Sequence, residues 1–263
     1  MRTIADIRAL LAQDKATVGT WLQLPDADVA ELMARAGYDW VAVDMEHGSF
    51  GRTCLPDIFR AIECGGAVPF ARLPEASKTA IKAALEAGAQ GLIFPMIESR
   101  EQLDRAIGWS IYPGLDTWAG AKPAEYRGVG YCRANVFGKE FDAYLAVAGD
   151  IFLVAQIEHI RAVENLESIL SHPRLDAIMV GPYDLSGSMG LTGQFDHPKF
   201  REVMQQIAEI CERCHARMGL HIVQPDPEAL DREITNGARF IAYGIDTVFL
   251  WKSAERPRQG GRQ

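Results

Sequence analysis

Three ionisable side chains follow one another directly after an apolar segment of the chain. Residues 38–43 are mostly apolar, and Asp44, Glu46 and His47 come immediately after them. Carboxylates beside an imidazole can act as general acids and bases or as ligands of a metal ion. In parallel α/β proteins such groups act at the carboxyl ends of the strands, so this segment predicts one edge of an active site.

Polar side chains also stand at the ends of other apolar segments. In a barrel, strand ends that are distant in sequence converge on one mouth, so these side chains are candidates for the same site. They share a position at or just after the end of a predicted strand: Arg72, Gln156, Glu158, His159, Gly181, Tyr183, Asp184 and His221.

The types of these residues point to metal-assisted chemistry on a 2-oxo acid. Glu158 and Asp184 are hard oxygen ligands, which suit an octahedral Mg²⁺, Mn²⁺ or Co²⁺ ion that keeps several waters. Such an ion can chelate a 2-oxo acid and stabilise its enolate as a Lewis acid. Arg72 can hold the keto or enolate oxygen, and His47 can act as an acid, a base or a water activator. Backbone N–H groups after Gly181 can hold a carboxylate if a helix begins there.

Structural roles explain some of these residues equally well. A salt bridge or a helix cap is the commoner role of a single carboxylate, and Asp44 is as well explained by a cap as by catalysis. We expect His159 and His221 to support or pack against the site. A purely structural account is much weaker for the set as a whole: Glu158, Asp184, Arg72 and His47.

The elements that must position these side chains alternate along the chain. Eight strands, nearly all followed by helices, predict an α/β fold, the (β/α)8 barrel, with an amphipathic helix before it at residues 1–8. A doubly wound sheet is the alternative, but the glycine-rich phosphate loop typical of it is absent from the sequence. The predicted strands cover residues 18–24, 38–44, 68–72, 91–96, 151–157, 177–180, 219–223 and 240–243. The predicted helices cover residues 26–36, 55–64, 77–87, 100–109, 141–148, 161–170, 199–217, 227–236 and 246–254.

One segment interrupts this alternation. Residues 112–140 are rich in glycine, proline and aromatic residues, and they include Arg127 and Arg133. A loop of this length in a compact domain is usually a lid or a binding loop, so we expect an ordered functional loop. The expected organisation is a single barrel domain over residues 1–263 with this loop as an insertion.

Composition limits the partners of the chain. Its 263 residues are 48% hydrophobic and 24% charged, and the formal net charge is −8. This acidic balance argues against nucleic-acid and anionic-membrane binding, and no segment is apolar for long enough to span a membrane. With five scattered cysteines and no signal-peptide core, the sequence predicts a cytoplasmic protein.

Cys211-Glu212-Arg213-Cys214-His215 matches the pattern of covalent haem attachment. The match is isolated, lies within a predicted helix and has no second pair of ligands at the spacing of a zinc site. We interpret Cys211 and Cys214 as small apolar residues one helical turn apart.

At this point the sequence resembles the HpcH/HpaI aldolases, a family of metal-dependent class II 2-oxo acid aldolases. The resemblance extends from about residue 19 to residue 250. It rests on GYDWVAVDMEHG at 37–48, ARLP at 71–74, GAQG at 88–91, RGVG at 127–130, QIE at 156–158, GPYDLS at 181–186 and GIDT at 244–247.

The resemblance implies roles for individual residues. It implies that Glu158 and Asp184 bind the divalent metal, that Arg72 contacts the keto oxygen of pyruvate, and that His47 serves acid/base chemistry with support from Asp44. It places Gln156, Gly181 and Tyr183 around the substrate. It also implies a homo-oligomer, a trimer or hexamer, in which neighbouring subunits exchange the last helix. Family members pair the histidine with a carboxylate of an adjacent subunit, and Glu86 occupies that position here, where Asp is familiar.

Some residues depart from the family pattern. Tyr183 stands where a small residue is usual, His159 stands where Ser or Thr is usual, and the loop before Arg127 is longer. These differences predict an altered aldehyde pocket.

The sequence therefore predicts a class II pyruvate aldolase. We expect reversible retro-aldol cleavage of a 4-hydroxy-2-oxo acid, a sugar-derived 2-keto-3-deoxy acid being one such substrate, to pyruvate and an aldehyde. A Schiff-base route is disfavoured because every lysine falls in a predicted helix or loop. The alternatives are a 2-oxo acid decarboxylase or acyl-CoA lyase with the same metal-enolate chemistry, and a non-catalytic barrel that binds 2-oxo acids.

Overall fold

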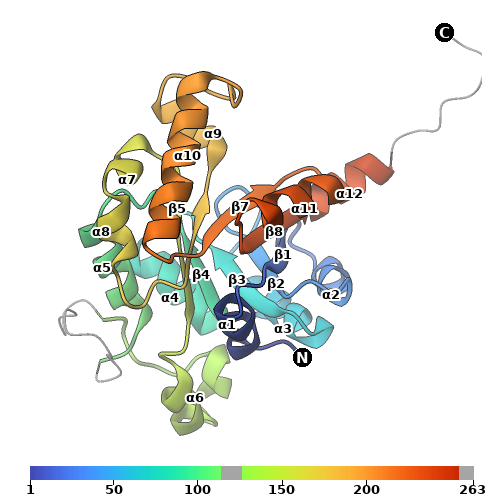
Figure 1. Cartoon of the computed structure of the whole chain (residues 1–263). Coiled ribbons are helices and arrows are strands. Elements are labelled where there is room, and N and C mark those ends of the chain that lie inside the picture. Colours follow the sequence, from blue (N-terminus) through green and yellow to red (C-terminus); the bar gives the residue numbers. More distant parts are fainter. Residues whose placement is uncertain (114–125, 255–263) are drawn as a thin grey trace, which may run out of the picture.

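The structure, a computed structural model, describes residues 1–113 and 126–254. Eight parallel strands pair in chain order and close into a barrel, with helices around its outside (Figure 1). This closed barrel confirms the predicted fold class. The strands are β1 (Thr17–Leu22), β2 (Trp40–Asp44), β3 (Val68–Arg72), β4 (Gly91–Phe94), β5 (Phe152–Ile157), β6 (Ala177–Val180), β7 (Met218–Ile222) and β8 (Phe240–Ile245).

Helices such as α3 (Leu55–Gly65), α4 (Lys78–Ala87) and α5 (Arg100–Ser110) cover the barrel because each presents a face of buried apolar residues to the strands. Several begin at a side chain that accepts backbone N–H groups, such as Asp26 and Ser77. They are α1 (Ile4–Ala12), α2 (Ala27–Arg35), α3 (Leu55–Gly65), α4 (Lys78–Ala87), α5 (Arg100–Ser110), α6 (Phe141–Val147), α7 (Ile160–Glu164), α8 (Leu166–Leu170), α9 (Pro182–Ser188), α10 (Pro198–Arg213), α11 (Pro227–Thr235) and α12 (Asp246–Ser253), with a 3₁₀ helix η2 (Arg133–Gly138).

A layer of aromatic rings fills the interior of the barrel. Trp40, Phe70, Phe152 and Phe240 are fully buried, and the centroids of their neighbouring rings lie 4.4 to 6.0 Å apart. The rings need space beside the neighbouring strand: a Cβ atom on Gly19 of β1, the register partner of Trp40, would lie 2.0 Å from the Trp40 ring. Glycine is therefore required at position 19.

The helix before the barrel packs beneath this layer. Thr3 and Asp6 form a capping box that starts α1, and Ile4, Ile7 and Leu11 on its inner face join the same buried cluster as the aromatic rings. The predicted helix at the start of the chain is thus present, and it lies at the end of the barrel remote from the strand carboxyl termini.

Two predicted helices were wrong in extent. The predicted helix at 161–170 is two short helices, α7 and α8, which meet at Asn165. The predicted helix at 199–217 ends at Arg213, because His215 adopts a left-handed conformation with φ of 53° that no α-helix continues through. Cys211 is buried and Cys214 is exposed, so the two cysteines do not share an apolar face.

Part of the predicted loop at 112–140 lies outside the described residues. The described part contains η2 and the residues Arg127 and Gly128. Gly128 lies close to Lys82 on α4. Within the described ranges, none of the helices combines the length and the apolar character that a bilayer span requires.

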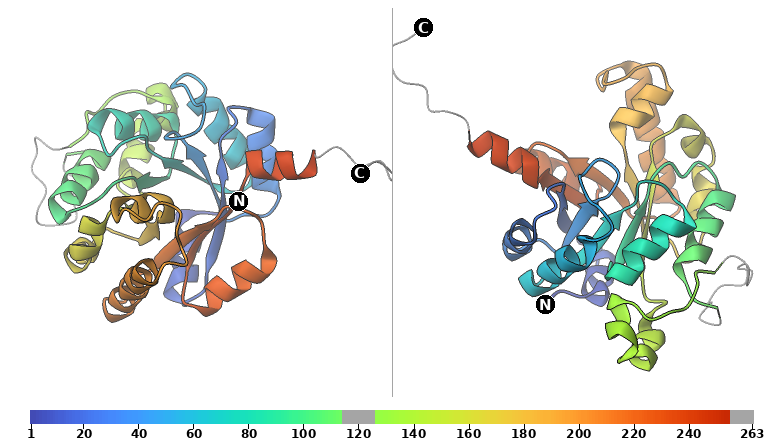
Figure 2. Two further views of the ribbon diagram at one scale, coloured as in Figure 1. Left: turned by 90° about the horizontal axis from the view of Figure 1, so that it is seen from above. Right: turned by 180° about the vertical axis from the view of Figure 1, so that it is seen from behind.

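The last helix, α12, extends away from the barrel, as both views of Figure 2 show. Its Leu250 and Trp251 side chains are 59% and 49% exposed. Exchange of this helix between subunits remains a prediction.

Candidate functional site

A buried ion pair joins the ends of two neighbouring strands at the mouth of the barrel. Asp44 and Arg72 are partners in the register of β2 and β3. Arg72 donates from Nε to Asp44 Oδ1 at 2.9 Å and from Nη2 to Oδ2 at 2.6 Å, a bidentate geometry. The guanidinium also lies 4.4 Å from the centre of the Trp21 ring. The guanidinium plane of Arg72 is therefore held by Asp44 at one edge and by the Trp21 ring.

Asp44 organises the turn that carries the other two candidates. It is 1% exposed, and its Oδ1 accepts the backbone N–H groups of Glu46 at 3.2 Å and His47 at 3.0 Å. Burial favours the neutral acid, but the hydrogen bonds and charge of Arg72, with bonds from Gln23 and His47, outweigh it and lower the pKa of Asp44. Asp44 thus caps the turn and anchors Arg72, which combines the two roles that its sequence position left open.

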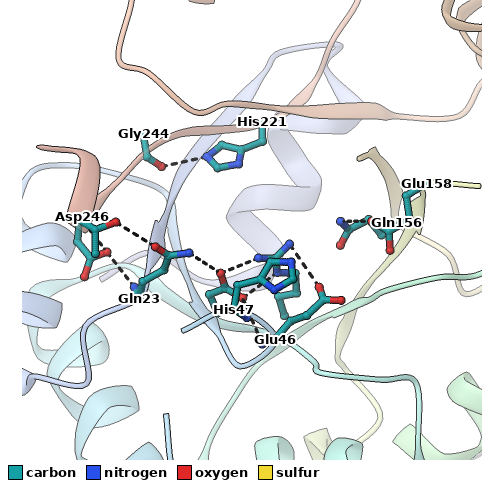
Figure 3. Close-up of polar contacts among 11 residues, drawn as sticks. Gln23, Glu46, His47, Gln156, Glu158, His221, Gly244 and Asp246 are labelled. Carbon is teal, nitrogen blue, oxygen red and sulfur yellow. Dashed lines mark hydrogen bonds and ion pairs between the residues drawn. The ribbon is translucent and has the colours of Figure 1, made fainter. Parts of the chain in front are cut away.

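Glu158 lies beside Gln156, on the other side of the site from His47 and Gln23 (Figure 3). It is 2% exposed and accepts hydrogen bonds from the Met96 backbone N–H at 2.7 Å and from Gln156 Nε2 at 2.6 Å. Burial, together with the negative charges of Glu46 and Asp184, raises the pKa of Glu158 to about 7. A buried carboxyl with acidic neighbours is stabilised by any cation that reaches it.

Asp184 lies in the first turn of α9 and is exposed. The helix begins at Pro182, directly after Gly181, as the sequence allowed. Gly181 permits a close approach to the neighbouring strand end, because a Cβ atom there would lie 2.6 Å from Glu158 Oε2 and 3.2 Å from Gln156 Nε2. Tyr183 points outward and is 60% exposed, and its ring meets Phe195 edge-on at 4.9 Å.

The structure places His47 at the mouth and Glu86 on the outer helix α4. His47 is exposed, and its backbone position is set by Asp44. In the described chain the ion-pair partners of Glu86 are Lys82 at 3.6 Å and Arg52 at 3.7 Å, and no contact with His47 is present. Pairing of His47 with a carboxylate of an adjacent subunit stays a prediction.

The two other histidines make local structural contacts. His159 Nδ1 accepts the backbone N–H of Arg161 and so caps α7. His221 Nε2 lies 3.2 Å from the Gly244 carbonyl, and its ring packs beside Trp21. Burial lowers the pKa of His221 to about 4, so its imidazole is neutral.

Three further residues lie at the site, of which Met96 and Gln23 were not predicted and Glu46 was noted only as a carboxylate after a predicted strand. Glu46 lies with its Oε2 3.4 Å from Arg72 Nη1, and burial raises its pKa despite the positive charges of Arg72 and His47. Met96 adopts a left-handed conformation with φ of 51°, which turns its N–H toward Glu158. Gln23 contacts Asp44. Glu46 alone had a sequence signal, as a carboxylate at a strand end.

The donor atoms at the mouth are of the kind that a divalent cation with open coordination positions prefers. Glu158 and Asp184, whose charges interact, are the carboxylates that could hold such a cation, and the Oε1 atom of Gln156 is buried without a hydrogen-bond partner among the described residues. Within the described ranges, no three His, Cys, Asp or Glu side chains gather closely enough to hold a metal ion by themselves. A cation here would take its remaining ligands from water or substrate oxygen atoms.

A closed parallel barrel with carboxylates and a carboxylate-held arginine at the carboxyl ends of its strands has the architecture of the (β/α)8 barrel enzymes. More particularly, the chain belongs to the HpcH/HpaI aldolase/citrate lyase family, whose sequence profile matches residues 17–253. The predicted resemblance is confirmed.

Individual relatives agree with this assignment. The chain is 34% identical to a 4-hydroxy-2-oxovalerate aldolase of Novosphingobium aromaticivorans, over 95% of this chain and 92% of the relative. It is 30% identical to a hydroxypyruvate/pyruvate aldolase of Paraburkholderia phytofirmans, over 96% of both chains. A crystal structure of an HpcH/HpaI aldolase/citrate lyase family protein from Burkholderia cenocepacia superimposes with a TM-score of 0.86 at 30% identity, over 95% of this chain and 96% of that one. Since aldolases are carbon–carbon lyases, these relatives confirm the predicted class of activity.

Proposed function

We propose that the protein is a divalent-metal-dependent pyruvate aldolase that reversibly cleaves a 4-hydroxy-2-oxo acid to pyruvate and an aldehyde. The observation that carries the proposal is the buried Glu158 carboxyl, whose pKa is raised to about 7, together with the fixed guanidinium of Arg72. The Glu158 side of the mouth favours the binding of a metal cation. The Arg72 side offers its positively charged guanidinium to an oxyanion. A 2-oxo acid carries the two adjacent oxygen functions that match this arrangement.

Glu158 and Asp184 are the residues that would hold the cation, which when bound supplies Lewis-acid polarisation of the 2-oxo group. Arg72 uses Nε and Nη2 on Asp44, and we propose that its Nη1 edge stabilises the negative charge that develops on the C2 oxygen. His47 would accept the proton of the C4 hydroxyl during cleavage and return it during synthesis. Gln156, whose Oε1 is free of other partners among the described residues, would line the pyruvate side of the pocket.

Tyr183 is proposed to contact the aldehyde portion. It precedes Asp184 directly, its ring is exposed at the mouth, and its contact with Phe195 limits its rotation. The relatives named above act on substrates that share a 2-oxo acid and differ in the remainder, so the aldehyde side is where this chain would differ. We further propose a cytoplasmic homo-oligomer, a trimer or hexamer, in which Glu86 of a neighbouring subunit reaches His47.

The test of the proposed function is proton exchange at the methyl group of pyruvate. With Mg²⁺, Mn²⁺ or Co²⁺ in deuterium oxide, we expect the methyl signal of pyruvate to disappear from the proton NMR spectrum. A chelator should stop the exchange, and the metal should restore it. Adding a panel of aldehydes should then give 4-hydroxy-2-oxo acids.

The alternatives give different results in the same assay. A decarboxylase would release carbon dioxide from a 2-oxo acid, and a non-catalytic barrel would bind pyruvate without exchange. Absence of exchange with every metal would exclude the aldolase proposal.

Gly181→Ala is expected to lower the rate of pyruvate exchange about a hundredfold, because its methyl group displaces the Glu158 carboxyl from its position. The measurement is the exchange rate at saturating metal concentration. Gly187→Ala on the same helix is the matched control, since its Cβ atom would lie 3.6 Å from Thr192 Oγ1, an ordinary contact. Equal rates in the two variants would show that the position of Glu158 does not matter.

A further inference from the structure

Gln23 connects the C-terminal helix to the arginine of the site. It follows β1 directly. Its backbone N–H group and both ends of its side-chain amide have hydrogen-bond partners (Figure 3). Its backbone N–H donates to Asp246 Oδ1 at 2.8 Å, its Oε1 accepts from Thr247 Oγ1 at 3.0 Å, and its Nε2 donates to Asp44 Oδ2 at 3.0 Å. Asp246 and Thr247 are the first residues of α12, whereas Asp44 ends β2.

Asp44 and Thr247 together fix the orientation of the Gln23 amide, because the carboxylate of Asp44 can only accept and the hydroxyl of Thr247 can donate. The hydroxyl of Thr247 donates to Oε1, so the NH₂ group is directed to the carboxylate. In the opposite orientation Oε1 would face Asp44 Oδ2, and two acceptors would oppose each other in a partly buried position. The amide is therefore a directional link, with its acceptor on α12 and its donor on Asp44.

This link reaches Oδ2 of Asp44, the carboxylate oxygen that lies closer to Arg72. Asp44 Oδ2 receives both Gln23 Nε2 and Arg72 Nη2, the latter at 2.6 Å. With Gln23 in place, both oxygens of the carboxylate are fixed and the bidentate plane of Arg72 follows. Without it, Oδ2 depends on Arg72 alone, while Oδ1 keeps the N–H groups of Glu46 and His47. The carboxylate then has a fixed donor from the rest of the fold on one oxygen only, and the plane of the Asp44–Arg72 pair is less tightly set.

The anchor at the other end of the link is rigid. Asp246 is 4% exposed and accepts the backbone N–H groups of Gln23, Leu24 and Thr247 at 2.8 to 2.9 Å. The first turn of α12 is thereby tied to the segment after β1. The rest of α12 extends from the barrel with Leu250 and Trp251 exposed.

We infer that Gln23 is a positioning residue that transmits the seating of α12, through Asp44, to the orientation of Arg72 and so to the binding of the 2-oxo acid. The ligand in this inference rests on the proposed function, but the geometric part does not. Gln23 does not touch the reacting atoms. Its effect appears in how well the oxyanion is held.

The kinetic test uses the full-length protein with pyruvate as the probe. Gln23→Leu removes the donor to Asp44. Thr247→Val removes the hydroxyl that donates to Gln23 Oε1. Both substitutions keep side chains of similar size. We expect the KM for pyruvate in methyl exchange to rise about tenfold in Gln23→Leu and severalfold in Thr247→Val, with kcat changed less than KM. Gln205→Leu is the matched control, because Gln205 is exposed on α10 and its side chain donates a hydrogen bond to Glu209 on the same helix.

A purely structural role would lower the melting temperature and leave KM for pyruvate unchanged, which would overturn the inference. Crystal structures of the two variants give a second readout that needs no activity. Loss of the bidentate Asp44–Arg72 contact in them supports the inference, and an unchanged pair overturns it. If the wild-type protein shows no exchange, the proposed function fails, and the crystal structures still decide the role of Gln23.

Discussion

Glu158→Gln should lose about three orders of magnitude in the rate of metal-dependent pyruvate exchange while keeping its fold. The amide keeps the size of the side chain and can still accept the Met96 N–H. Gln156 now donates Nε2 to this position, so its amide must turn over to present Oε1, which has no partner among the described residues, to the new NH₂ group. What the substitution removes is the negative charge in a buried position that we propose for the cation. The exchange rate at several metal concentrations and circular dichroism measure the two parts of this expectation.

Proton release on metal binding gives an independent readout of the same residue. The pKa of Glu158 is about 7, so the carboxyl is mostly protonated at about pH 6 and mostly ionised at about pH 8. Binding of Mn²⁺ should therefore release about one proton at the lower pH and almost none at the higher. Calorimetry in buffers of different ionisation enthalpy measures this number, and Glu158→Gln should show no release at either pH.

Glu98→Gln is the matched control for this experiment. Its hydrogen bond with Arg161 lowers the pKa of Glu98, so this carboxyl is already ionised at the lower pH and its loss should not change proton release. Normal metal affinity and proton release in Glu158→Gln would show that the cation binds elsewhere.

Arg72→Met should abolish exchange activity and destabilise the protein by about 3 kcal/mol, because it leaves the buried charge of Asp44 without its counterion. The free energy of unfolding in urea measures the second effect. The size of the effect follows from Asp44 being 1% exposed, since water cannot replace the guanidinium.

A double variant separates stability from function at this pair. Adding Asp44→Asn to Arg72→Met removes the unpaired charge, keeps an amide oxygen for the N–H groups of Glu46 and His47, and should restore much of the stability but none of the activity. A single variant as stable as the wild type would mean that Asp44 takes up a proton or rearranges at little cost, and the pair would then not be an anchor.

The sequence allowed the strands to be predicted well because each is a short apolar run in a fully covered parallel sheet. The predicted bounds of β3 and β6 agree with the structure, and the polar residues at their ends lie at the mouth of the barrel. Asp44 and Arg72 could be identified for this reason. Their mutual contact could not, because it depends on the register of β2 against β3.

What could not be predicted are features set by closure of the barrel or by single backbone torsions. The link from Gln23 to Asp246 requires β1 to lie beside β8, residues that are more than two hundred positions apart. The strand predicted at 91–96 is shorter in the structure, because Met96 adopts a left-handed conformation that few non-glycine residues adopt. The sequence has no local pattern that signals either feature.

The aromatic layer beneath the site has a consequence for how the molecule assembles. Trp40 and Phe70 come from the first four strands, and Phe152 and Phe240 come from the last four. The rings also meet across the two halves, since Trp40 stacks on Phe240 at 4.4 Å and Phe70 lies 5.4 Å from Phe152, so each half buries two large rings partly against the other. Separate half-barrels would expose apolar surface, so each half depends on the other for stability. The mouth of the barrel forms only when both halves have associated.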